Sequence, residues 1–190
     1  MKLQTHALFV LISAILLLGM AASQASELRQ IYVVGLDYGG DSLQVVNNST
    51  GEKTHTDVNS GGYFAYGGMA AIGDFEAQAT IGYKVSGLFY DAPIWKAYPV
   101  DLMLLYRFSY FRVGLGLTKH YAARLESQIN ANPFTYYEDS TGEIAQIGWK
   151  SGDHFSIDLR FTTIKFKEKN VINAPELNGN VIGLYMGLAL

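Results

Sequence analysis

The chain has 190 residues, a net charge of −3 and no cysteine, and it is rich in Tyr, Gly and Phe but contains only 4 Pro. The mild acidity and the lack of a basic patch argue against a nucleic-acid partner. The lack of cysteine excludes a fold held together by disulfides. Abundant Gly and aromatic residues favour extended, closely packed strands.

Residues 1–25 have the features of a secretory signal peptide. Lys2 precedes an apolar run from Ala7 to Ala22, and small residues follow at the positions that a signal peptidase recognises. The run is shorter than the about 20 apolar residues of a transmembrane anchor. We therefore expect a signal peptide at 1–25 and a single mature domain at 26–190. No later stretch is apolar enough to span a bilayer as a helix, which leaves a periplasmic or secreted protein or a membrane barrel.

Seven segments of the mature region carry the alternation that is typical of β-strands, and an eighth expected strand, residues 62–72, is rich in Gly and Ala, so its facing is ambiguous. In the clearest one, Phe155 to Phe161, apolar residues alternate with Ser, Asp and Arg, so the two sets lie on opposite faces. No convincing helix interrupts the series. The expected strands are residues 31–38, 62–72, 75–83, 100–108, 111–117, 144–150, 155–161 and 180–190.

The connections between these segments alternate between long and short. Tight turns are expected at Gly73-Asp74, Ser109-Tyr110 and Ser151-Gly152-Asp153. In an up-and-down barrel every second connection lies on the same rim, so all tight turns would share one rim, as in outer-membrane barrels. The expected long connections cover about 40–60, 86–97, 119–142 and 168–179. The sequence therefore predicts an all-β fold, an eight-stranded antiparallel up-and-down transmembrane β-barrel.

Alternation does not by itself say which face is inside, and a soluble lipocalin-like barrel would have its apolar face inward. Strands of about nine to eleven residues are long enough to cross a bilayer at a tilt. Aromatic residues gather at the strand ends, as expected for girdles at the two membrane interfaces. We therefore expect the apolar face to contact lipid and the charged, Gly-rich face to line the lumen. The expected girdle residues are Phe75, Phe108, Tyr110, Phe111, Trp149 and Phe155 at the short-turn rim, and Tyr38, Tyr63, Tyr83, Tyr98 and Phe166 near the long loops.

The hairpin from Tyr106 to Leu117 and the last strand, Gly183 to Leu190, resemble the small outer-membrane barrels of the OmpA, OmpX and OmpW kind. The resemblance covers the mature region as a pattern. It implies a monomer in the outer membrane of a Gram-negative bacterium, with membrane lipids, lipopolysaccharide and the outer-membrane assembly machinery as partners. Members of this group commonly end in an aromatic residue, whereas this chain ends in Leu190.

Charged residues on the polar face are expected to share a narrow lumen. An eight-stranded barrel has an interior that side chains just fill, and buried charges must be paired. We expect a salt-bridge plug, with a gated ion path as the alternative. The expected lumen charges are Asp37, Glu76, Lys84, Asp101, Arg107, Arg112, Lys150, Asp158, Arg160 and Lys165. The central network is expected to comprise Glu76, Asp101, Arg107, Arg112, Asp158 and Arg160.

Arg107 and Arg112 carry the sharpest expectation. If Ser109-Tyr110 is a two-residue turn, the two arginines lie opposite each other, where like charges destabilise a sheet. Arginine cannot relieve this repulsion by losing its proton. We therefore expect Glu76 or Asp158 to bridge the pair near the periplasmic end.

The mature chain offers few candidates for catalysis or metal binding. His55, His120 and His154 are expected to be solvated loop or strand-end residues, and the His55-Thr56-Asp57 segment is a weak metal pattern. We expect no catalytic residue, no cofactor and no metal. The sequence favours a non-enzymatic envelope-structural or surface-interaction role, with function in the long loops. A channel for small hydrophobic molecules and a lipid A-modifying enzyme remain as alternatives.

Overall fold

A computed structural model describes residues 27–46, 51, 53–86, 93–127 and 134–190 of this chain. The expected signal peptide therefore lies outside the described residues. Within the described ranges, no helix is long and apolar enough to cross a membrane. The barrel is formed by β1 (Glu27–Gly39), β4 (Gly61–Ile72), β5 (Phe75–Val85), β6 (Ile94–Phe108), β7 (Phe111–Glu126), β9 (Ser140–Ser151), β10 (Phe155–Thr163) and β13 (Val181–Ala189).

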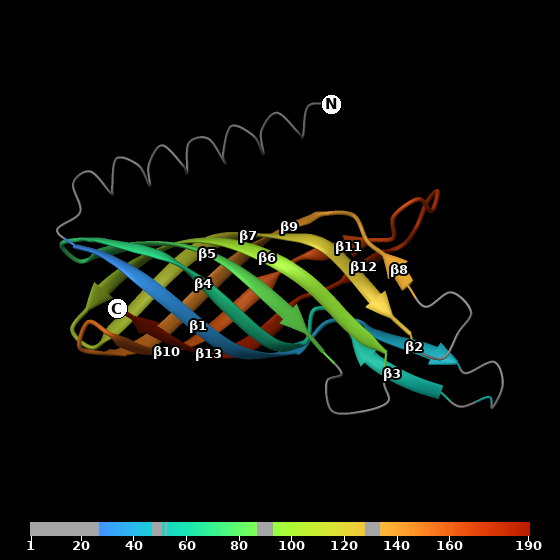
Figure 1. Cartoon of the computed structure of the whole chain (residues 1–190), viewed down its shortest axis with the longest axis horizontal. Coiled ribbons are helices and arrows are strands. Elements are labelled where there is room, and N and C mark those ends of the chain that lie inside the picture. Colours follow the sequence, from blue (N-terminus) through green and yellow to red (C-terminus); the bar gives the residue numbers. More distant parts are fainter. Residues whose placement is uncertain (1–26, 47–50, 52, 87–92, 128–133) are drawn as a thin grey trace.

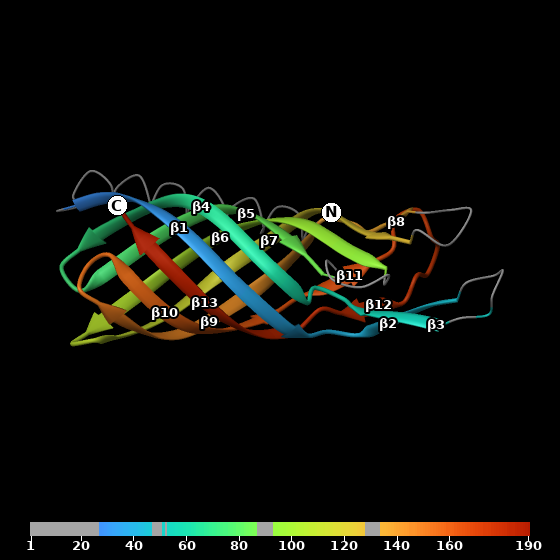
Figure 2. The ribbon, with the colours of Figure 1, turned by 60° about the horizontal axis from the view of Figure 1, so that its bottom comes forward.

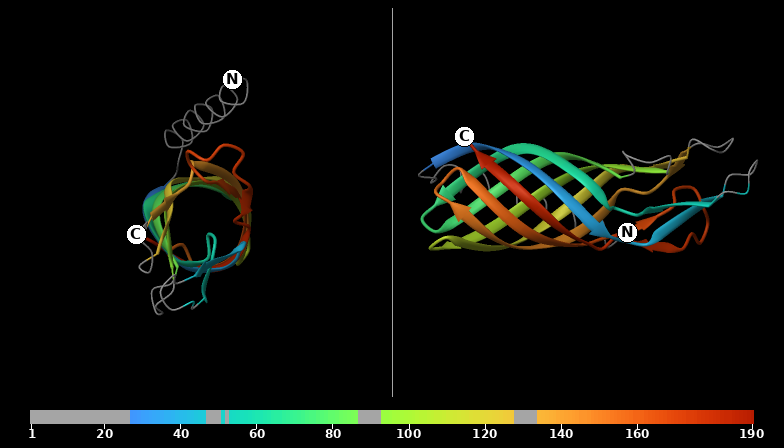
Figure 3. Two further views of the ribbon diagram at one scale, coloured as in Figure 1. Left: turned by 90° about the vertical axis from the view of Figure 1, so that its right-hand side faces the viewer. Right: turned by 90° about the horizontal axis from the view of Figure 1, so that it is seen from below.

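These strands pair antiparallel in the order β6-β5-β4-β1-β13-β10-β9-β7, and β7 pairs back with β6. The sheet therefore closes on itself (Figure 1), and the view along its axis shows a ring of strands (Figure 3). Closure removes the free strand edges that would otherwise attract other chains. The predicted eight-stranded antiparallel up-and-down barrel is confirmed.

The short turns lie together at one rim of the barrel, as predicted. Phe108 pairs with Phe111 across Ser109-Tyr110, so this connection is a two-residue turn. Ser109 has a φ of 56°, and Gly73 in the β4–β5 turn also has a φ of 56°, in the left-handed region that tight hairpin turns require. The chain ends at this rim, where Leu190 and Gln30 exchange two backbone hydrogen bonds of 2.9 and 3.0 Å.

The apolar face points outward and the polar face points into the barrel, which confirms the predicted facing. In β10, Ile157, Leu159 and Phe161 are exposed, whereas the alternate residues are buried. The same alternation runs through β9 and β13. An exposed apolar belt around a buried polar interior is the reverse of a soluble protein and is what a bilayer requires.

The predicted aromatic girdles are partly wrong. Tyr38 and Tyr98 are exposed near the long loops, but Tyr63 is only 2% exposed and Phe166 is fully buried. The residues of β4 are mostly Gly, Ala and aromatic, so they gave no reliable alternation. Tyr63 faces inward because its hydroxyl donates to a buried carboxylate, and Phe166 packs in an aromatic cluster at the outer end.

Short strands extend the molecule beyond the long-loop rim. β2 (Ser42–Val46) and β3 (Lys53–Asp57) form one hairpin, and β11 (Lys165–Lys167) pairs with β12 (Glu176–Asn178). β8 (Phe134–Tyr136) pairs with the outer end of β7. Figure 2 shows that these strands all lie at the same end of the barrel. The segments expected as long loops are therefore partly folded into a structured cap.

Candidate functional site: the barrel interior

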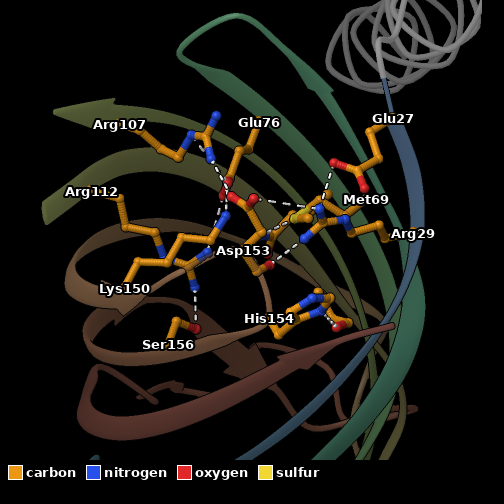
Figure 4. A network of polar contacts seen from close by, with 12 residues as sticks. Glu27, Arg29, Met69, Glu76, Arg107, Arg112, Lys150, Asp153, His154 and Ser156 are labelled. Carbon is orange, nitrogen blue, oxygen red and sulfur yellow. Dashed lines mark hydrogen bonds and ion pairs between the residues drawn. The ribbon is translucent and has the colours of Figure 1, made fainter. Parts of the chain in front are cut away.

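Near the short-turn rim, one buried arginine joins three strands. Arg112 on β7 donates from Nε and Nη2 to Asp158 on β10, at 2.7 and 2.5 Å. Its Nη1 donates to Oε2 of Glu76 on β5 at 3.1 Å, and Nη2 also donates to the Ser156 hydroxyl at 2.7 Å. Glu76 is fully buried and also accepts from the ammonium of Lys150. We call Glu76, Arg112, Lys150, Ser156 and Asp158 the inner layer, and Figure 4 labels the first four of them.

Arg107 lies at the mouth beside this layer. Its Nε is 3.5 Å from Oε1 of Glu76, while its Nη1 donates to Asp153 at 3.0 Å and its Nη2 to the carbonyl of Gly73 at 3.0 Å. Arg29 also binds Asp153, because its Nη1 donates a hydrogen bond to the backbone carbonyl of Asp153 at 2.5 Å. Partial burial raises the pKa of Asp153, but the nearby cations outweigh it and hold that pKa below its usual value.

A second layer crosses the middle of the lumen. Arg160 on β10 donates from Nη1 to Oδ2 of Asp101 on β6 at 3.0 Å and from Nε to Gln146 at 2.9 Å. The Tyr63 hydroxyl donates to the same Asp101 oxygen at 2.7 Å, and the Thr118 hydroxyl donates to Oδ1 at 2.6 Å. Each charge is therefore both paired and hydrogen-bonded, which is the condition for burying it.

The middle layer continues through an aromatic contact. The guanidinium carbon of Arg160 lies 4.1 Å from the centroid of the Tyr185 ring and 5.6 Å from that of Tyr63, so the cation lies against two π-faces. The Tyr185 hydroxyl in turn donates to Asp37, whose Oδ2 is 2.7 Å from the ammonium of Lys84. The side chains of these layers thus come from all eight barrel strands: β1, β4, β5, β6, β7, β9, β10 and β13.

The lumen charges balance within the described part of the chain. The buried acids are Asp37, Glu76, Asp101 and Asp158, and the buried cations are Lys84, Arg112, Lys150 and Arg160. Glycine makes room for this network, since a Cβ at Gly148 would lie 2.0 Å from Oδ1 of Asp158. A small residue opposite a charged one is how a narrow barrel fits both.

An apolar cluster closes the lumen at its outer end. The Trp95 ring lies 5.0 Å from Phe166 and 4.8 Å from Tyr137, measured between centroids, and Phe166 lies 5.7 Å from His120. Burial and the nearby Glu168 carboxylate raise the pKa of Tyr137 to about 12. The members of this outer plug are Val58, Trp95, Ala97, Ala123, Leu125, Tyr137, Ile164 and Phe166.

The structure separates the three histidines of the predicted mature chain. His120 is only 3% exposed and faces the lumen, so the expectation of a solvated residue is wrong for it. Its inward position follows from the β7 alternation, in which Arg112 and Thr118 also face inward. His55 is exposed on β3, and His154 contacts the Ala189 carbonyl at 2.8 Å at the opposite rim. In the described ranges, no three His, Cys, Asp or Glu residues cluster in a way that could hold a metal ion.

Lys165 is not a lumen residue, and its prediction is wrong. Its side chain is 70% exposed, and its ammonium pairs with Glu176 on β12 at 3.0 Å. The outward positions of β10 continue as Thr163, Lys165 and Lys167 beyond the apolar belt. Four partners of the lumen charges were not predicted, although each occupies an inward position of its strand: Tyr185, Thr118, Gln146 and Ser156.

The barrel is similar to a solved structure, that of neisserial surface protein A. The TM-score is 0.53 at 10% sequence identity, and the match covers 86% of this chain and 97% of that chain. At this identity the similarity concerns the fold, a small closed β-barrel. No protein-family model and no curated protein sequence matches the chain.

Proposed function

We propose that this protein is a non-enzymatic outer-membrane barrel of a Gram-negative bacterium. Its closed interior stabilises the fold, and its outer hairpins serve as the interaction surface. The observation that carries the proposal is the inverted burial pattern: outward residues such as Leu104 and Leu115 are 58% and 71% exposed, whereas Glu76 and Asp101 are 0% and 3% exposed. Only a hydrocarbon environment makes that arrangement favourable.

The packed lumen favours a structural role over transport. The cavity among Tyr63, Lys84, Asp101, His120 and Arg160 has a volume of about 10 Å³, which is no more than a single water needs. The outer plug covers the next part of the lumen. A gated ion path or a channel for hydrophobic molecules would require both the middle layer and the outer plug to move. Paired charges hold the middle layer in place, and aromatic packing holds the outer plug.

Export and assembly belong to the same proposal. Residues 1–25 would be removed as a signal peptide, and residues 26–190 would insert as a monomer through the outer-membrane assembly machinery. The backbone hydrogen bonds between Leu190 and Gln30 join β1 to the segment after β13 at the short-turn rim. The surrounding membrane lipids and lipopolysaccharide would contact the apolar belt.

Fractionation of cell envelopes on a density gradient tests the proposal. We expect the mature protein in the outer-membrane fraction, with a gel mobility that changes on boiling, and no conductance steps when it is reconstituted in planar bilayers. Recovery as a soluble periplasmic protein would contradict the membrane assignment. Discrete conductance would favour the channel alternative, and an altered lipid A acyl pattern on overexpression would favour an enzyme.

A further inference from the structure

A pocket opens on the outer wall of the barrel, where the apolar belt ends. Along the outward face of β7, Leu115 and Leu117 are followed by Lys119 and then Tyr121. Tyr98, the partner of Tyr121 on β6, is also exposed. Tyrosine and lysine at this position are typical of the interface between hydrocarbon and headgroups. The pocket therefore lies at the level of the outer-leaflet headgroups if the barrel spans the membrane as proposed.

The pocket has a volume of about 530 Å³, and its walls include Tyr121, Tyr136, Glu138, Asp139 and Lys169. Its shape is fixed by backbone pairing. Tyr136 pairs with Arg124 of β7, and the Lys169 amide donates to the Tyr136 carbonyl at 2.9 Å. Ala122, with a φ of 48°, forms the adjoining irregularity in β7. Its amide donates to Oδ1 of Asp139 at 3.3 Å, which holds that carboxylate at the wall.

Several polar groups at this pocket are free to meet a ligand. Lys169 lines the pocket, and Lys119 lies beside it, with its ammonium 4.9 Å from the centroid of the Tyr121 ring. Within the described ranges, neither lysine has a carboxylate partner within ion-pair distance. Glu138 also forms no ion pair there. Tyr121 and Tyr136 are 37% and 51% exposed.

These groups match the parts of a phosphorylated sugar. Ammonium groups pair with phosphate, carboxylates accept hydrogen bonds from hydroxyls, and tyrosine rings offer flat apolar faces with a polar tip. A site directly above the apolar belt would receive such a sugar on the end of acyl chains. We propose that this pocket binds the phosphorylated saccharide headgroup of an outer-leaflet glycolipid, which in the proposed location is lipopolysaccharide.

The mixed charge of the pocket distinguishes this ligand from a simple anionic lipid. Glu138 and Asp139 would repel a headgroup that carries only phosphate, whereas a saccharide supplies hydroxyl donors for both. The inference rests on the proposed outer-membrane location and specifies one lipid contact within it.

The test uses full-length mature protein refolded without lipopolysaccharide and titrated in detergent with three probes. These are purified lipopolysaccharide, the same material after enzymatic dephosphorylation, and phosphatidylglycerol. The variants are Lys119→Ala with Lys169→Ala, and Tyr136→Ala, all at exposed or half-buried positions. Lys53→Ala on the β2–β3 hairpin is the control, since it removes an exposed lysine elsewhere on the outer cap. A boiling-dependent gel shift verifies that each variant is folded.

We expect lipopolysaccharide to bind the wild type and Lys53→Ala alike, and to bind the double lysine variant at least about tenfold more weakly, because two charge-assisted contacts are lost. Tyr136→Ala should also bind it more weakly, and dephosphorylated material should bind all proteins weakly. Equal affinity for lipopolysaccharide in all variants, equal binding of the dephosphorylated material, or equal binding of phosphatidylglycerol would overturn the assignment. Fractionation with the outer membrane remains a separate result, so failure here leaves the proposed function standing.

Discussion

Arg107 and Arg112 lie directly opposite each other on β6 and β7, yet their surroundings differ. Arg112 is 3% exposed and binds Glu76 and Asp158, whereas the Arg107 side chain is 27% exposed at the mouth and binds Asp153. Both guanidinium groups approach Glu76. The like charges are therefore separated by one shared carboxylate inside and by a second carboxylate at the rim.

The first prediction concerns Glu76 and Lys150. Glu76→Gln should destabilise the barrel by about 3–5 kcal/mol, because it leaves the buried Lys150 ammonium without a carboxylate partner, while Arg112 keeps Asp158. Adding Lys150→Met should restore part of that loss. Arg107→Met should restore less, because Arg107 is partly exposed and has Asp153. Urea unfolding in lipid vesicles, followed by gel mobility, measures the free energies. Equal rescue by both second changes would contradict this account.

The second prediction compares two glycines. Gly148→Ala should destabilise by about 1–3 kcal/mol, because its Cβ would overlap the Asp158 carboxylate that holds Arg112. Gly68→Ala, on the outward face of β4, should have little effect because nothing lies within 4 Å of its Cβ position. The same unfolding assay measures both. An unchanged free energy of unfolding in Gly148→Ala would contradict this account, because it would show that the inner layer can accommodate an added methyl group.

The third prediction concerns the outer plug. Phe166→Ala removes a fully buried ring between Trp95 and His120, and should cost about 3–5 kcal/mol at the outer end. Exchange of backbone amide hydrogens should become faster in β11 and β12, whereas the amides of the strand segments around the inner layer should stay protected. The matched control is Phe161→Ala, because this phenylalanine on the preceding strand is 45% exposed. Uniform loss of protection along the whole barrel would show that the plug is not a separate unit.

The fourth prediction is a pH dependence at the mouth. The pKa of Asp153 is lowered in the folded state, so its contribution to stability is present above its unfolded pKa of about 3.9 and is lost as pH falls through the folded pKa. Asp153→Asn should therefore narrow the difference in stability between neutral pH and pH about 3. Asp74→Asn, in the neighbouring turn, is the control. The denaturation midpoint is measured against pH. An identical acid response in wild type and Asp153→Asn would refute the assigned role.

The barrel could be predicted from sequence because its signals are local. The alternation from Phe155 to Phe161 separates the two faces of its strand, and the two-residue turn at Ser109-Tyr110 determines the register of its hairpin. The Arg107–Arg112 pairing follows from that turn alone. Glu76 and Asp158 could also be predicted as partners of this pair, because each occupies a position at similar depth on another strand, whereas Asp153 in the β9–β10 turn was not predicted.

The remaining errors come from contacts that join distant parts of the chain. Tyr63 and Phe166 were wrongly predicted at the membrane interface, because an aromatic residue suits either face of a strand. Their inward orientation depends on contacts with distant residues, the hydrogen bond of Tyr63 to Asp101 and the packing of Phe166 against Trp95. His120 is buried because β7 continues well past the membrane belt to Glu126. Lys165 lies outside the barrel because β11 pairs with β12, and no local sequence pattern predicted that hairpin.

The orientation of the strand faces is the central claim, and cysteine scanning of β10 tests it most directly. The chain contains no native cysteine, so single substitutions can be spin-labelled without background. We expect labels at Ile157, Leu159 and Phe161 to collide freely with lipid-dissolved oxygen in vesicles. Labels at Ser156 and Thr162 should be shielded from lipid, because these side chains face the lumen. Lipid exposure at Ser156 and Thr162 instead, or no alternation along β10, would contradict the account.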